Sequence, residues 1–103
     1  MNEYIVSVTR EDIRRGEQND RFKCPISLAI KESGIKDIMF ADVGSASIEV
    51  YLTRGRTVRL ENETSLQRWI DDFDSWRKSA SPLSVRLDFE KKMAGIESEE
   101  SKL

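Results

Sequence analysis

Apolar and polar side chains alternate over residues 46–60, and this alternation constrains the fold of the chain more than any other feature. Two such runs flank Arg54 and Gly55, and the side chains on their apolar face are Ile48, Val50, Leu52, Val58 and Leu60. A period of two is typical of strands with one buried face, and glycine suits the tight turn that joins them. The sequence therefore predicts an antiparallel hairpin with its turn at Arg54 and Gly55.

An amphipathic helix is predicted after the hairpin, from Thr64 onward. Its apolar residues recur at helical spacing and form one stripe: Leu66, Trp69, Ile70, Phe73 and Trp76. Such a stripe packs against a sheet, and this explains the two tryptophans better than base stacking does. We expect Trp69 in the core and Trp76 at the edge of the stripe, with the helix ending before Pro82.

A short helical turn over residues 10–15 is predicted near the N-terminus. Thr9 and Asp12 have the spacing of a capping box, in which each side chain accepts a hydrogen bond from the other residue's backbone N–H. Gly16 is expected to end this turn by taking a positive φ. A second helix is expected from Pro25, which suits a first helical position, to the C-terminal cap Gly34.

The predicted elements together make an α+β domain. Their order is β-α-β-β-β-α-β, which describes a two-layer sandwich: an antiparallel or mixed sheet with helices on one face. The strands are expected over residues 4–8, 37–43, 46–53, 56–60 and 83–89. From Glu90 the composition turns polar and acidic. We expect a single domain over residues 1–89 and a C-terminal tail over 90–103 that is disordered or a frayed helix.

Charge and cysteine content restrict the class of partner and the cellular compartment that we expect. The 103 residues carry 17 basic and 19 acidic side chains, a net charge of −2, whereas nucleic-acid binders usually carry a basic surplus. Nucleic acid is therefore not the expected partner. With one cysteine the chain forms no internal disulfide, which fits a reducing compartment. No apolar run is long enough to span a membrane and no signal peptide is recognisable, so we expect a location in the bacterial cytoplasm.

The residue types argue against an enzyme. The chain contains no histidine, which removes Ser-His-Asp and Cys-His chemistry and most zinc sites. Cys24 precedes a helix, where a thiol can be activated, but a small buried residue is the better interpretation. Asp71, Asp72 and Asp74 could supply two neighbouring carboxylates to a divalent metal, yet a solvated helix face is the better interpretation of them. We expect no catalytic residue, no metal and no cofactor.

Residues 54–59 form the strongest candidate binding segment. Arg54, Arg56 and Arg59 place three positive charges there with no negative one, and Tyr51 projects from the polar face of the preceding strand. Arginine forks suit phosphate and carboxylate groups. A second basic stretch over residues 10–23 is nearly cancelled by its own acidic residues. The sequence therefore predicts a partner site at Arg54, Arg56, Arg59 and Tyr51, although an ordinary exposed turn would look the same.

Two parts of the chain carry a recognisable set of packing and capping motifs. The first part covers residues 8–13, Gly16 and residues 24–30, and the second covers the helix end at Phe73 and Asp74 and the segment from Pro82 to Phe89. In these parts the chain resembles a group of small bacteriophage and prophage proteins with a Cys-Pro-Ile-Ala-Leu-Ala type helix, with Ser27 where alanine is usual in that pattern. The resemblance leaves out the hairpin and the tail, and its motifs concern packing and capping. It implies a phage or mobile-element origin.

Three functions follow as hypotheses. The first, which we favour, is a non-enzymatic protein that binds and inhibits a host protein, such as a defence complex. The second is a protein that sequesters a small nucleotide-type ligand; because the chain is short, its pocket would form between subunits of a homodimer or higher oligomer. The third, which the lack of histidine disfavours, is a carboxylate-metal hydrolase that uses Asp71 and Asp74.

Overall fold

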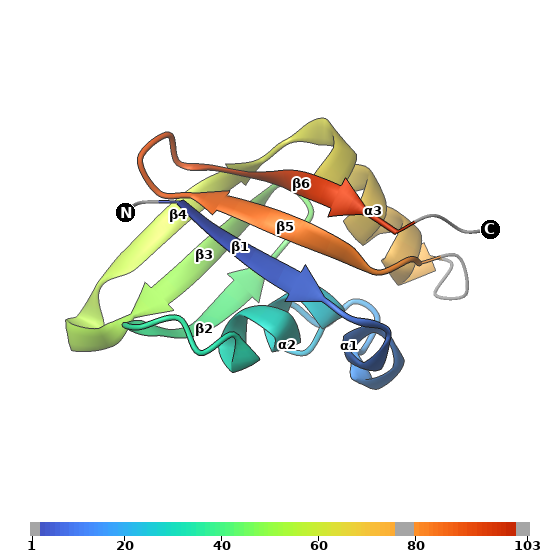
Figure 1. The fold of residues 1–103 in the computed structure, drawn as a ribbon, viewed down its shortest axis with the longest axis horizontal. Coiled ribbons are helices and arrows are strands. Elements are labelled where there is room, and N and C mark those ends of the chain that lie inside the picture. The colour runs from blue at the N-terminus through green and yellow to red at the C-terminus, as the bar shows by residue number, and fades with distance from the viewer. Residues whose placement is uncertain (1–2, 76–79, 101–103) are drawn as a thin grey trace.

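The computed structural model describes residues 3–75 and 80–100, which form an α+β fold with a six-stranded mixed sheet and three α-helices (Figure 1). The sheet curls strongly into a half-barrel. The elements in chain order are β1 (Glu3–Val8), α1 (Arg10–Arg15), α2 (Pro25–Glu32), β2 (Ile38–Val43), β3 (Ser47–Leu52), the 3₁₀ turn η1 (Thr53–Gly55), β4 (Thr57–Asn62), α3 (Thr64–Ser75), β5 (Leu83–Asp88) and β6 (Met93–Glu99).

The strands lie in the order β1-β5-β6-β4-β3-β2. All neighbours are antiparallel except β4 and β6, which run parallel and pair only at Glu61 with Met93 and at Asn62 with Ala94. The predicted hairpin is confirmed as β3 and β4, with an unbroken register from Ser47–Glu61 to Tyr51–Thr57. The class prediction, α+β, is confirmed as well.

The curl leaves the edge strands β1 and β2 on the same side of the molecule, and α2 packs against both (Figure 1). Its Ile26, Ala29 and Ile30 are buried in the core that the concave face of the sheet surrounds. The third helix, α3, packs against β6 and buries the predicted stripe of Leu66, Trp69, Ile70 and Phe73. Trp69 is in the core as expected, and its indole Nε1 donates to Ser81 O at 3.0 Å. The predicted place of Trp76 lies outside the described residues.

The segment from Glu90 corrects the sequence-based prediction of an acidic tail. Met93–Glu99 is a strand in the interior of the sheet, between β5 and β4, and Ala94 is 0% exposed. The predicted order lacked this strand because its composition is polar. In the structure the outer face of the sheet accommodates that polarity: Glu97 pairs with Arg86 at 3.0 Å, and Glu99 accepts a hydrogen bond from Ser81 at 2.7 Å.

The capping box of α1 is confirmed, but the expected role of Gly16 is wrong. Thr9 Oγ1 accepts from Asp12 N at 3.1 Å, and Asp12 Oδ2 accepts from Thr9 N at 3.0 Å. Gly16 caps this helix with a φ of −67°, which any residue can adopt. A Cβ at Gly16 would lie 2.6 Å from the Cδ and Cγ atoms of Pro25. Gly16 is therefore required by the close approach of the chain to the start of α2, not by its backbone conformation.

Candidate functional site

Arg54 and Arg56 lie at the tip of the β3–β4 hairpin, at one end of the long axis of the molecule (Figure 1). Both are exposed, and neither forms an ion pair with any residue of the described part of the chain. Together with Lys36, Asp37 and Thr53 they line a hollow of about 380 Å³. Asp37 is engaged by Thr53, whose hydroxyl donates to its carboxylate at 3.3 Å. The hollow thus has three cations and one carboxylate around it.

Arg54 holds an unusual backbone conformation for its residue type. Its φ is 67° and its ψ is 28°, and the following Gly55 has a φ of 71°. Two successive residues in the left-handed region give the turn the twist that strand pairs prefer. Glycine, asparagine and aspartate are the usual residues at such positions, because a Cβ makes the conformation cost about 1 kcal/mol or more.

Arg59 is separated from the two tip arginines. It projects from the outer face of β4, forms an ion pair with Glu61 at 3.4 Å, and lines a different hollow of about 400 Å³ with Lys91 and Lys92. The structure therefore gathers Arg54 and Arg56 with Lys36, and Arg59 with two lysines from the β5–β6 turn. The sequence did not indicate that Arg59 lies near Lys91 and Lys92, because it predicted no strand after Glu90.

Tyr51 stands on the outer face of β3, half-buried, and belongs to an aromatic stack. Its ring lies 4.6 Å from that of Phe40, with 13° between the planes, and Phe22 lies 6.2 Å from Phe40. We call Phe22, Phe40 and Tyr51 the aromatic face. Phe22 is 51% exposed, and so is Met39, the neighbour of Phe40 at an irregularity in β2.

Sequence reasoning missed Phe22, Met39 and Phe40 as surface residues. Residues 17–23 are mostly polar, and the strand expected over residues 37–43 is too rich in apolar residues to show which face is exposed. One signal was available: Phe40 and Asp42 alternate with Ala41 and Val43, and the latter two are the buried ones. Phe22 is held by its loop, where Asp20 Oδ1 accepts from its backbone N at 3.0 Å. No pattern in the sequence indicates that this loop lies beside β2.

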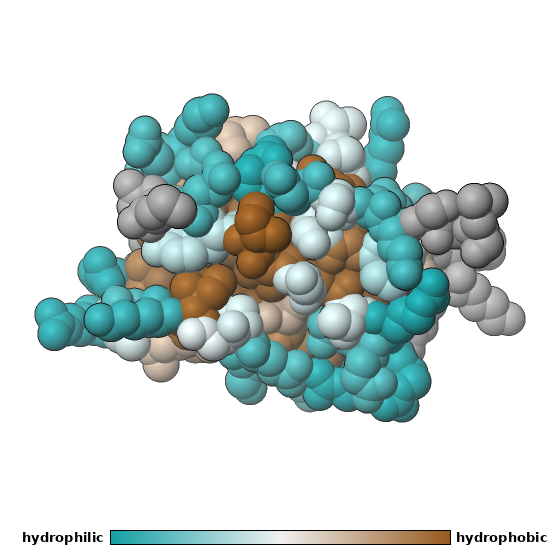
Figure 2. All heavy atoms as spheres, viewed as in Figure 1, coloured by the Kyte–Doolittle hydropathy of each residue, from teal (hydrophilic) through white to brown (hydrophobic). Residues whose placement is uncertain are grey.

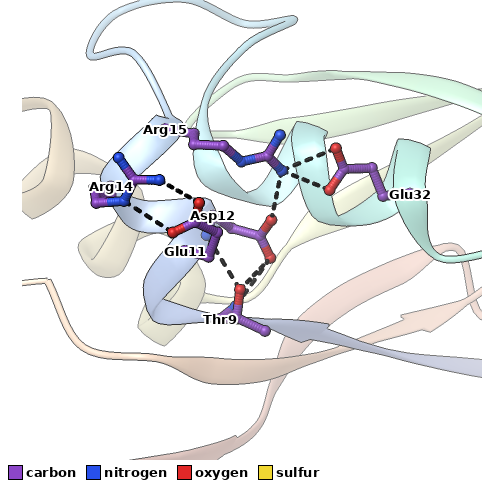
Figure 3. A network of polar contacts seen from close by, with 6 residues as sticks. All are labelled: Thr9, Glu11, Asp12, Arg14, Arg15 and Glu32. Carbon is purple, nitrogen blue, oxygen red and sulfur yellow. Dashed lines mark hydrogen bonds and ion pairs between the residues drawn. The ribbon is translucent and has the colours of Figure 1, made fainter.

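The second basic stretch is used internally, as its charge balance predicted (Figure 3). Arg15 bridges Asp12 of its own helix at 3.4 Å and Glu32 of α2 at 2.6 Å, and the Glu32 carboxylate raises the pKa of Arg15 above its ordinary value. Arg14 pairs with Glu11 on the same helix. These contacts join α1 to α2 and leave little charge for a partner.

Cys24 and the aspartates of α3 have structural surroundings. Cys24 is the buried N-cap residue of α2, and burial raises the pKa of its thiol to about 11, so the thiol is protonated near neutral pH. Asp71 and Asp72 are exposed, and Asp74 accepts from Asn19 N at 2.9 Å. Within residues 3–75 and 80–100, no three cysteine, aspartate or glutamate side chains gather in a way that could hold a metal ion.

The chain matches no family model, no curated protein and no solved structure with which it was compared. The resemblance to small phage proteins therefore stays a prediction, and the functional argument rests on the geometry of the surface. None of the described helices is long and apolar enough to cross a membrane.

Proposed function

We propose that this chain is a non-enzymatic binding protein whose partner is another protein, held by the aromatic face and the two tip arginines. The observation that carries the proposal is the exposure of Phe22 beside the Phe40–Tyr51 stack, together with the exposure of Met39, which precedes Phe40 in β2. Aromatic residues, methionine and arginine are the types enriched where proteins bind one another. Burying the exposed half of Phe22 alone would contribute about 2 kcal/mol to a complex.

Arg54 supports the same proposal from the backbone. A strained residue persists where the surrounding structure enforces it, and such residues cluster at functional positions. An exposed turn with no role could carry asparagine or glycine at this position without strain. The arginine contributes a charge at the tip that no carboxylate of the described chain neutralises, so it suits a partner with an acidic surface.

The class of partner follows from the resemblance to phage proteins. Small proteins of phage origin commonly act on the cell that they enter, so we propose a host protein, with host-defence enzymes as the first group to test. Inhibition would result from occupying the partner's surface and needs no chemistry in this chain. The bacterial cytoplasm is the corresponding location.

A second candidate, sequestration of a small anionic ligand such as a nucleotide, is favoured by the tip hollow. Lys36, Arg54 and Arg56 line this hollow, and its volume of about 380 Å³ lies within the range of ligand pockets. Tyr51 does not line this hollow, so the arrangement offers anion contacts but no aromatic ring. A ligand with a stacked base would need a ring from a second subunit.

Native mass spectrometry of gently purified protein from bacterial cells separates the two functions. A protein partner at fixed stoichiometry supports the first, and a small mass lost on denaturation supports the second.

Once the partner protein is identified, substitutions test the aromatic face as the interface. Phe22→Ser should weaken binding at least tenfold, whereas Ile5→Ser should not, although Ile5 is equally exposed at 49%. Equal effects of the two substitutions would contradict the aromatic face as the interface. The effect of Arg56→Gln on binding, compared with that of Lys31→Gln as the control, tests the contribution of the tip charge in the same way.

A further inference from the structure

The sheet splits between β4 and β6. These parallel strands pair at only two positions, Glu61 with Met93 and Asn62 with Ala94. Toward the hairpin tip, β4 then runs away from the β5–β6 turn, as Figure 1 shows at the end of the molecule where the chain begins. The side of β4 over residues 57–60 is therefore a free edge inside the sheet. The split opens into the hollow that Arg59 lines, which we call the notch.

The backbone of β4 directs unpaired groups into the notch. Successive residues of a strand point their N–H and C=O groups to opposite neighbours. Arg56 O accepts from β3 at 2.8 Å, whereas Glu61 N donates to Lys92 O on the β6 side at 2.9 Å. Since the register with β3 is unbroken, Thr57 and Arg59 face the same side as Glu61. Neither forms a backbone hydrogen bond toward β6 within the described residues.

The side chains that line the notch are mostly polar or basic, and two of them, Val58 and Met93, are apolar. The notch holds about 400 Å³, and its lining is Thr57, Val58, Arg59, Glu61, Lys91, Lys92 and Met93. Arg59 and Glu61 pair with each other at 3.4 Å, while Lys91 and Lys92 have no ion-pair partner among the described residues. The turn that carries them is fixed, because Asp88 Oδ1 accepts from Lys91 N at 2.9 Å. The net charge around the notch is thus positive.

We propose that the notch binds an extended, acidic segment of a partner protein, which adds to β4 as a short strand. The N–H and C=O groups of Thr57 and Arg59 have no hydrogen-bond partner on the β6 side in the described part of the chain, and a peptide backbone supplies the acceptors and donors they need, as in other cases of strand addition. Its acidic side chains meet Lys91 and Lys92, and its apolar side chains meet Val58 and Met93. The four free residues of β4 span about 13 Å, enough for three or four residues of a guest strand.

The chemistry of the notch favours a peptide over a nucleic acid. A phosphate chain would satisfy the lysines and the two N–H groups, but it has no backbone donor for the carbonyls of Thr57 and Arg59. The proposal concerns a surface outside the aromatic face and does not rest on the proposed function.

The test uses a fluorescein-labelled peptide, acetyl-Val-Glu-Val-Glu-Val-Glu-amide, and fluorescence anisotropy on the full chain. We expect saturable binding and shifts of the Thr57 and Arg59 amide signals in NMR spectra. Lys91→Gln with Lys92→Asn should weaken binding at least fivefold; asparagine is chosen because Lys92 has a φ of 56°. The charge-matched control, Lys23→Gln with Lys31→Gln, should bind as the parent does.

Two further comparisons separate strand addition from simple charge attraction. Thr57→Pro deletes the N–H that faces the notch without removing a bond to β3, and the Arg56 conformation, φ −88° and ψ 148°, suits a following proline. It should abolish binding, while Thr57→Val should not. On the parent protein, the same peptide with N-methylated backbone should not bind, which answers the question even if Thr57→Pro fails to fold. Equal binding of the N-methylated peptide, or of a single-stranded oligonucleotide, would overturn the proposal.

Discussion

Arg54 is the residue at which stability and the proposed function conflict. Its left-handed backbone conformation, φ 67° and ψ 28°, is one that asparagine adopts more readily than arginine. We expect Arg54→Asn to raise the free energy of unfolding by about 0.5–1 kcal/mol, which corresponds to a Tm increase of about 2–8 °C. The same substitution removes a tip charge and should weaken partner binding.

Thermal unfolding by circular dichroism measures this gain, with Arg56→Asn as the control. Arg56 is just as exposed and charged, but its φ of −88° is an ordinary extended value, so its replacement relieves no strain. An equal Tm for Arg54→Asn and the parent, or an equal gain in both variants, would show that the turn stores no strain at Arg54.

At the scale of elements, the junction between α1 and α2 depends on a close contact that has no room for a side chain. A Cβ on Gly16 would lie 2.6 Å from ring atoms of Pro25 and 2.8 Å from its backbone N, and neither group can move without shifting the start of α2. We expect Gly16→Ala to lower the free energy of unfolding by about 2–3 kcal/mol.

Gly44→Ala is the matched control for this effect. The three atoms nearest to a Cβ at Gly44 all belong to the guanidinium of Arg21, the closest at 3.0 Å. This group is the far end of a flexible, exposed side chain, and moving it weakens at most the surface ion pair with Asp42. The control should change the free energy of unfolding by less than about 0.5 kcal/mol. Chemical denaturation of both variants gives the comparison, and similar losses in both would contradict the role of the Gly16–Pro25 contact.

The elements that the sequence predicted well are those whose own pattern determines them. The β3–β4 hairpin follows from strict alternation, α3 from a stripe of large apolar residues, and α1 from the capping box of Thr9 and Asp12. The β6 strand lacks such a signal, because Ala94 and Gly95 are small and its acidic residues resemble a tail. Its place is set by pairing with β5 and β4, which lie apart from one another in the sequence.

The candidate site was predictable in part for the same reason. Arg54 and Arg56 belong to the hairpin turn, so their exposure at the tip followed from local pattern. The aromatic face and the notch depend on contacts between distant segments: Phe22 reaches Phe40 across the sheet edge, and Lys91 reaches the edge of β4. A single sequence carries no pattern that indicates contacts between such distant segments.

At the scale of the whole molecule, the half-barrel separates a buried concave side from a surface with a polar rim. In Figure 2 apolar atoms lie in the middle of the face that carries β1 and α2, with hydrophilic atoms around them. The helix α2 fills the space between the two edge strands, and β6 connects the antiparallel pair β1–β5 to the antiparallel group β2–β3–β4. Without β6 the two halves of the sheet share no strand pairing.

This connection predicts that the chain cannot fold without its last strand. Removing residues 91–103 deletes β6, exposes the inner edges of β4 and β5, and unpairs Arg86 from Glu97. Small domains are stable by only about 5–15 kcal/mol, so we expect loss of cooperative unfolding. Removing residues 101–103 alone keeps all of β6 and also the bond from Glu100 N to Pro82 O, 2.8 Å long, and should leave Tm unchanged. Circular dichroism and NMR amide dispersion distinguish the two truncations. A folded, cooperatively melting protein without residues 91–103 would mean that the first five strands form a sheet by themselves.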